Sequence, residues 1–90
     1  MALEVRFRLS ARKELNHLPR ADAERMEARL EAYALDPEAI GHDVVPIRGK
    51  PGRLRMRSGD WRAIFGRRDD QVLAVTVGHR GRFIDERRSQ

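Results

Sequence analysis

The arginines of one short stretch are the side chains of this sequence best suited to chemistry. Arg53, Arg55 and Arg57 alternate with apolar residues, and Arg62 follows the turn signal at residues 58–60. Successive side chains of a strand point to opposite faces, so a two-residue turn returns Arg62 to the face of the other three arginines. A guanidinium stays charged at any working pH and donates in a planar fork. The predicted β-hairpin can therefore hold and polarise a phosphate, but its arginines are poorly suited to proton transfer.

An arginine-rich, solvated strand face is the alternative interpretation of this pattern. Like charges that face each other across strands destabilise a sheet, which favours an anionic ligand. The distribution of charge in this chain of 90 residues with formal net charge +5 supports a ligand. Residues 48–68 carry eight basic residues against one acid, whereas residues 20–43 carry seven acids against three arginines. One basic surface of this kind is typical of a protein that binds a polyanion.

Proton transfer would need other side chains, and the candidates lie near the C-terminus. Histidine is the residue type whose unperturbed pKa lies nearest neutrality, which makes His79 a candidate. The alternation of the strand puts it on the opposite face from the arginines unless the strand has ended. A catalytic role and a structural or capping role both remain open for it. Asp85 and Glu86 are bases if the tail folds over the site, and solvated charges otherwise. Phe83 could stack on a nucleic-acid base but cannot move a proton.

No metal site and no cofactor are predicted. Cysteine is absent, which excludes disulfides, thiolate catalysis and cysteine-ligated zinc. The spacing of His17 and His42 relative to His79 does not match that of metal ligands, and no phosphate-binding loop, dinucleotide fingerprint or nucleophile elbow is present. We expect neither a signal peptide nor a membrane span. The sequence therefore indicates a single domain over residues 1–90, with a cytoplasmic location.

The N-terminal half should supply one strand and two helices. Residues 3–9 alternate between apolar and charged, which predicts a half-buried strand with Leu9 facing the core. Ser10 is the expected N-cap of a short helix over residues 11–18. Apolar residues then recur at three- and four-residue spacing, which predicts a helix from about residue 20 to residue 35.

The C-terminal half should supply the rest of a sheet. Residues 38–51 are expected to form a loop with a short extended piece at 44–47. After the hairpin, residues 72–77 are nearly all apolar, which is typical of a central strand. A short helix over residues 82–87 should follow. The predicted fold class is α+β, in which a mainly antiparallel sheet has an N-terminal strand, a helical pair packed on one face, three consecutive strands and a short C-terminal helix.

Three sequence blocks follow one another at characteristic spacing. They are Ile47-Arg48-Gly49, then Leu54-Arg55-Met56-Arg57-Ser58-Gly59-Asp60-Trp61-Arg62-Ala63-Ile64-Phe65, and finally Val77-Gly78-His79-Arg80. With the order of elements, these blocks resemble the RelE/ParE toxin superfamily of bacterial type II toxin–antitoxin systems, and more closely its RelE-like mRNA interferases. The resemblance covers nearly the whole chain.

The resemblance implies a site and a reaction. RelE-like toxins use basic residues on the middle strands to bind mRNA in the ribosomal A site, where a ribose 2′-hydroxyl attacks the adjacent phosphate without a metal. By position, Arg62, Arg80 and Arg55 correspond to the catalytic arginines. The expected RNA- and phosphate-binding residues are Arg53, Arg55, Arg57, Arg48 and Lys50. The implied partners are mRNA and a RelB-like or similar small antitoxin in a hetero-oligomer, with no membrane.

One departure from the resemblance keeps other functions open. Family members with strong nuclease activity commonly have a tyrosine a few residues beyond the arginine equivalent to Arg80, and no tyrosine occurs there in this sequence. The single tyrosine, Tyr33, lies on the apolar stripe of the second helix and is expected in the core. The alternatives are a ParE-like inhibitor of DNA gyrase without nuclease activity, and a catalytically weak RelE-like relic.

Overall fold

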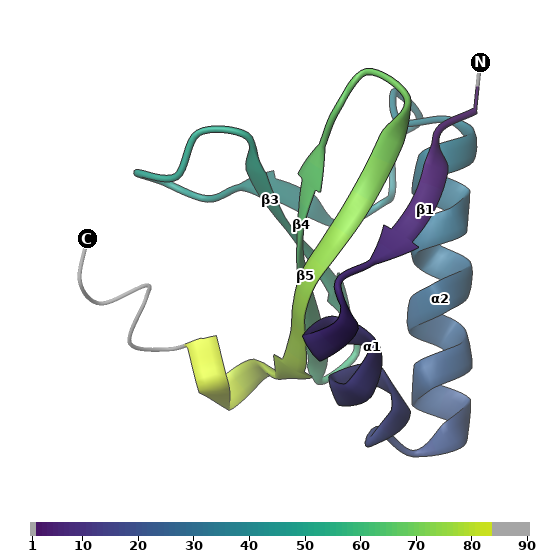
Figure 1. The fold of residues 1–90 in the computed structure, drawn as a ribbon, viewed down its shortest axis with the longest axis vertical. Helices are drawn as coiled ribbons and strands as arrows, with labels where there is room; N and C mark the ends of the chain where they lie inside the picture. The colour runs from purple at the N-terminus through teal and green to yellow at the C-terminus, as the bar shows by residue number, and fades with distance from the viewer. Residues whose placement is uncertain (1, 84–90) are drawn as a thin grey trace.

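The computed structural model describes residues 2–83, which form two helices against one sheet (Figure 1). The elements in chain order are β1 (Glu4–Phe7), α1 (Leu9–Asn16), α2 (Arg20–Leu35), β2 (Val44–Pro46), β3 (Arg53–Ser58), β4 (Trp61–Arg67), β5 (Gln71–His79) and the 3₁₀ turn η1 (Arg80–Phe83). The predicted α+β class is confirmed. No helix among these residues is long and apolar enough to cross a membrane.

The five strands form one sheet in the order β1-β5-β4-β3-β2. Strand β1 pairs with β5 in parallel, and the other neighbours pair antiparallel. The apolar run over residues 72–77 correctly predicted an internal strand, because β5 lies between β1 and β4. The extended piece expected at residues 44–47 is the edge strand β2, which is the fifth strand beside the predicted N-terminal strand and three consecutive strands.

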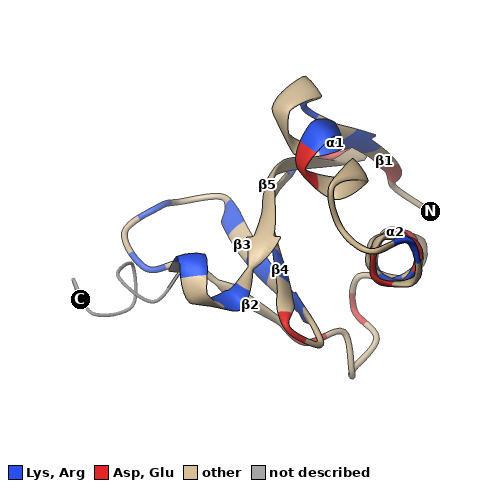
Figure 2. Cartoon of the chain, turned by 90° about the horizontal axis from the view of Figure 1, so that it is seen from below, with Lys and Arg blue, Asp and Glu red and all other residues tan. Residues whose placement is uncertain are grey.

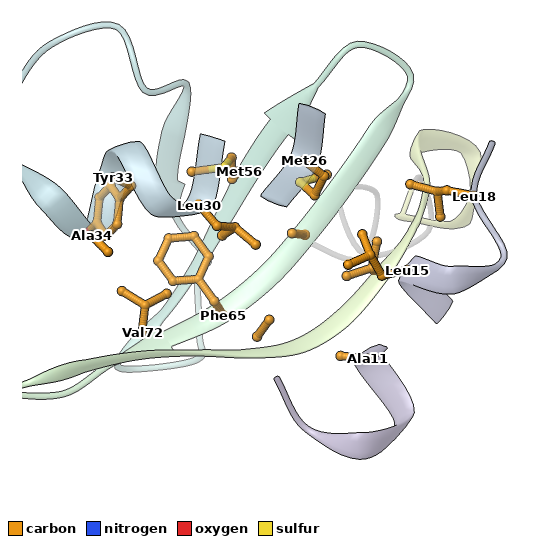
Figure 3. Close-up of a cluster of buried hydrophobic side chains, with 13 residues drawn as sticks. Ala11, Leu15, Leu18, Met26, Leu30, Tyr33, Ala34, Met56, Phe65 and Val72 are labelled. Atoms are coloured by element: carbon orange, nitrogen blue, oxygen red, sulfur yellow. The ribbon is translucent and has the colours of Figure 1, made fainter. Parts of the chain in front are cut away.

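The hydrophobic core lies between the helices and one face of the sheet. Strong apolar periodicity predicted α2 with both of its bounds, and its buried side chains include Met26, Leu30 and Tyr33. Tyr33 packs edge to face against Phe65 of β4, with ring centroids 5.2 Å apart. Figure 3 shows Phe65 facing the labelled residues of α2. This layer fixes the hairpin in place, and no α-helix of residues 2–83 covers the opposite face.

The prediction for the junction between β1 and α1 was wrong. Helix α1 begins at Leu9 with Arg8 as its N-cap, and Leu9 is 70% exposed instead of facing the core. The Arg8 N–H donates to the Ala74 carbonyl at 2.9 Å, while the Arg8 carbonyl accepts the Arg12 N–H at 2.9 Å. Backbone pairing at Arg8 therefore sets the change from strand to helix, and Ser10 lies inside the first turn.

The C-terminal prediction was partly outside the described residues. The 3₁₀ turn η1 begins at Arg80, two residues before the helix expected over residues 82–87. It begins there because the Arg80 N–H donates to the Asp60 carbonyl at 2.7 Å, which bends the chain toward the hairpin turn as soon as β5 ends.

Candidate nucleic-acid interface

The hairpin register places the predicted arginines on one face of the sheet. The turn is Gly59-Asp60, so that Arg57 pairs with Arg62, while Arg55 and Arg53 pair with Ile64 and Gly66. The residues between them, such as Met56 and Ala63, are fully buried against the helices. Figure 2 shows Lys and Arg segments along β3 and β4, with α2 on one side of these strands.

Three other cations, Arg55, Arg57 and Arg80, lie close enough to Arg62 to perturb it. We call Arg55, Arg57, Arg62 and Arg80 the arginine cluster. The pKa of Arg62 is lowered, first by partial burial and then by the charges of Arg57, Arg55 and Arg80. The carboxylate of Asp60 acts in the opposite direction. A lowered pKa means that the positive charge is less favourable here than in water, so an anion bound at Arg62 would relieve this cost.

The Arg62 side chain is held by main-chain oxygens. Its Nη1 donates to the carbonyls of Gly59, at 2.8 Å, and Trp61, at 3.0 Å. Within residues 2–83, neither Arg62 nor Arg55 makes an ion pair with a carboxylate. The centre of the cluster thus carries two guanidiniums that make no direct ion pair with an acid of residues 2–83, which leaves their donors available to a phosphate.

The other two cluster members each contact an acid. Arg57 Nη2 lies 3.3 Å from Asp43 Oδ1, and Arg29 Nη2 lies 3.1 Å from Asp43 Oδ2. Arg80 Nε lies 3.6 Å from Asp60 Oδ1. In all three ion pairs, both side chains are at least 33% exposed to solvent. Such pairs are weak, so a phosphate could compete with the carboxylates. Two carboxylates therefore flank the centre of the cluster.

The remaining predicted phosphate-binding residues lie farther along the hairpin. Arg53 shares the face of the cluster, and its Nη1 would lie 3.6 Å from a Cβ built at Gly66. Arg48 and Lys50 are exposed in the loop between β2 and β3. Both precede β3, so they lie outside the two strands and the turn that carry the cluster.

Among the predicted proton carriers, His79 lies within the described residues. His79 pairs with Trp61, their rings meet edge to face at 5.4 Å, and Gly81 N–H donates to His79 Nδ1 at 3.2 Å. Its neighbour Gly78 pairs with Arg62, so His79 lies on the opposite face, as the alternation predicted. These contacts match the structural role. Asp85 and Glu86 lie outside the described residues, as does the side chain of Phe83.

Sequence reasoning did not find the group that fixes the end of β5. Glu14 Oε1 accepts the Val77 N–H at 3.0 Å, and Glu14 Oε2 lies 2.8 Å from Arg82 Nη1, which also donates to the Val77 carbonyl at 3.1 Å. A Cβ built at Gly78 would lie 2.7 Å from Arg82 Nη1, so a side chain there would displace the arginine. The pairing joins residues 63 positions apart, for which the sequence carries no local signal.

A cavity of about 510 Å³ lies at the C-terminal end of α2. Its lining includes Tyr33, Ile40, His42, Val45 and Arg67, and none of the arginine cluster. Across residues 2–83, no three histidine, aspartate or glutamate side chains are grouped closely enough to hold a metal ion.

Comparison with known families identifies the fold. A family model described as "ParE toxin of type II toxin-antitoxin system, parDE" matches residues 5–83. The chain belongs to the RelE/ParE toxin superfamily. It is thus a toxin of the type II toxin–antitoxin class. A search of curated proteins found no match.

Solved structures of RelE proteins share the toxin's fold. RelE of the RelE–RelB complex from Pyrococcus horikoshii is 25% identical, with a TM-score of 0.75 over 91% of this chain and 99% of that chain. The RelBE2 complex from Mycobacterium tuberculosis contains a chain 24% identical, with a TM-score of 0.72 over 89% of this chain and 100% of that chain. A mutant of E. coli RelE in the free state is 22% identical, with a TM-score of 0.72 over 98% of this chain and 93% of that chain.

Proposed function

We propose that this toxin is a ribosome-dependent endoribonuclease that cleaves mRNA and so inhibits translation. The observation that carries the proposal is the centre of the arginine cluster, where Arg55 and Arg62 have no carboxylate partner among the described residues. The lowered pKa of Arg62 adds to it, since the protein holds these cations together at an electrostatic cost. Surfaces that concentrate uncompensated arginines are suited to an RNA backbone.

In the proposed reaction the ribose 2′-hydroxyl attacks the adjacent phosphate, and the bond to the 5′-oxygen of the next nucleotide breaks. Negative charge grows on the phosphoryl oxygens in the transition state, where Arg62, Arg55 and Arg80 would donate hydrogen bonds. Arginine is poor at proton transfer, so these side chains contribute charge stabilisation and orientation. The ribosome would hold the mRNA in line for attack, which supplies the proximity that a small, exposed site lacks.

The proposal includes a cognate antitoxin. The solved complexes from P. horikoshii and M. tuberculosis pair the toxin with a RelB antitoxin. A RelB-like partner of this toxin would carry an acidic segment over the arginine cluster, because complementary charge favours that contact. Such a segment would block access of RNA to the same guanidiniums. The toxin would act where ribosomes translate, in the cytoplasm.

The test compares cleavage of translated mRNA by the wild type and by Arg62→Ala and Arg80→Ala. Both variants should lose cleavage and growth arrest upon induction. The matched control is Arg68→Ala, since Arg68 is an exposed arginine of the β4–β5 turn outside the cluster, and it should retain both activities. Unchanged cleavage by the two cluster variants would contradict the assignment of the site.

Inhibition of DNA gyrase is the second candidate. Two observations favour it: the matching family model describes a ParE toxin, and residues 81–90 contain no tyrosine. A supercoiling assay with purified toxin separates the candidates, because a ParE-like inhibitor blocks gyrase in the absence of ribosomes. Inhibition of gyrase without cleavage of mRNA would replace the first proposal.

A further inference from the structure

Asp60 holds Arg80 through two separate contacts. The Arg80 N–H donates to the Asp60 carbonyl at 2.7 Å, and Arg80 Nε lies 3.6 Å from Asp60 Oδ1. Arg80 follows the last pair of the β4–β5 ladder, Trp61 with His79. The sheet itself therefore does not orient the Arg80 side chain, and the turn between β3 and β4 does so instead.

The acid is costly for a surface that binds RNA. A carboxylate beside the arginine cluster repels the phosphate backbone and weakens the attraction of the cations. Asp60 also counteracts the lowering of the pKa of Arg62, which shows that its charge reaches the centre of the cluster. A toxin with a neutral residue in place of Asp60 would bind RNA more tightly.

We propose that Asp60 is a positioning residue of the RNA-cleaving site, which aims the Arg80 guanidinium at the reacting phosphate at the expense of RNA affinity. This inference rests on the proposed function. Asp60 acts through Arg80 and does not touch the reacting atoms. Replacing the carboxylate should therefore change binding and cleavage in opposite directions, whereas a residue needed merely for folding would weaken both.

The structure offers a matched control in Asp43. It too lies beside the cluster, contacts Arg57 at 3.3 Å and is 46% exposed, against 65% for Asp60. Asp43→Asn makes the same change in charge, and asparagine tolerates the positive φ of 56° at this residue. Asp43 has no contact with Arg80, so its replacement should strengthen RNA binding with little effect on the maximal rate.

The experiment measures single-turnover cleavage of mRNA on programmed ribosomes at increasing toxin concentration. For Asp60→Asn we expect the maximal rate to fall about 10- to 100-fold, as for other losses of orientation. The half-saturating concentration should fall about threefold at low salt, with the difference shrinking as salt is added. Asp60→Glu keeps the charge and should recover most of the rate. Thermal unfolding of each variant checks that the fold is intact.

A second measurement reads the position of Arg80 without cleavage. NMR relaxation of the Arg80 Nε–H group, assigned with Arg80→Lys, should show greater mobility in Asp60→Asn and unchanged order in Asp43→Asn. An unchanged maximal rate in Asp60→Asn, or a joint loss of binding, rate and thermal stability, would overturn the proposal. If the wild type cleaves no mRNA, the proposed function fails, and unchanged order of Arg80 in Asp60→Asn would overturn the positioning role independently.

Discussion

The two faces of the β3–β4 hairpin differ more than any other neighbouring regions of the toxin. On the face toward the helices, Met56, Ala63 and Phe65 are fully buried. On the other face, Arg57 pairs directly with Arg62, although like charges across a ladder destabilise a sheet. The same two strands therefore stabilise the fold through one set of residues and accept an electrostatic cost through the alternate set. If the arginine face is the functional site, stability and function are carried by adjacent residues and can be separated by mutation.

The largest expected effect is on the buried face. Phe65→Ala should lower the free energy of unfolding by about 3–5 kcal/mol, because it removes the fully buried ring that packs against Tyr33. Ile64→Ala, one residue away on the arginine face, should cost about 1 kcal/mol because Ile64 is half-buried. Urea denaturation measures both values. Equal losses would contradict the division between the two faces.

The counterpart on the arginine face is Arg62→Ala. If the toxin is a ribonuclease, cleavage should slow about 100- to 1,000-fold, as for the loss of one group that stabilises an oxyanion. The free energy of unfolding should stay the same or increase, since the change relieves repulsion with Arg57 and Arg55. Cleavage assays and thermal unfolding of the same preparation measure the two quantities. Lost activity accompanied by lost stability would blur the distinction.

Replacing Glu14 tests the contact that holds the end of β5 and η1 together. Glu14→Ala should cost about 1–3 kcal/mol of stability, because the part-buried Val77 N–H loses its acceptor and Arg82 loses its ion pair. Glu14→Gln keeps an acceptor and should cost less. If the toxin is a ribonuclease, cleavage should fall as well, since Arg82 belongs to η1, which also carries Arg80. Urea denaturation measures the loss of stability, and cleavage assays measure the loss of activity. A loss of one without the other would contradict the prediction.

The smallest effect is expected at the glycines of the arginine face. Gly78→Ala should lower the free energy of unfolding by about 1 kcal/mol. The new Cβ would lie only 2.7 Å from Arg82 Nη1, so the arginine side chain would have to move. In Gly66→Ala the new Cβ would meet Arg53 at an ordinary contact distance of 3.6 Å, so stability should change by less than about 0.5 kcal/mol. A shift of the midpoint of thermal unfolding distinguishes them, and equal shifts would show that Arg82 yields freely.

Local patterns predicted the parts of the fold that depend on local chemistry. The helical spacing of residues 20–35 and the turn signal at residues 58–60 were sufficient to place α2 and the hairpin, and the structure decides for Gly59-Asp60 as the two turn residues. The start of α1 was missed because backbone pairing of Arg8 with Ala74 outweighed the capping preference of Ser10. A register shift between β4 and β5 was also missed, because the unpaired residue Val75 is apolar like its neighbours and hides the change of face.

The candidate site was predictable to a similar extent. Strand alternation alone identified which arginines share a face. It could not show that Arg57 contacts Asp43, because the acid approaches from a loop 14 residues earlier with a positive φ. Nor could it show that Arg80 bends back to Asp60. These distant contacts decide which arginines form an ion pair and which do not. The centre of the cluster can therefore be identified from the structure but not from the sequence.

The pair of side chains at the end of β5 also affects how the toxin meets other chains. Strand β1 pairs with β5 as far as Ala74, and beyond it no strand of residues 2–83 lies beside the outer edge of β5. Glu14 and Arg82 occupy the backbone donor and acceptor of Val77 at that edge. Open strand edges recruit strands from other molecules and lead to aggregation. A strand from a second copy could pair at Val77 only after the ion pair between Glu14 and Arg82 is broken. This ion pair therefore disfavours edge-to-edge association of the toxin.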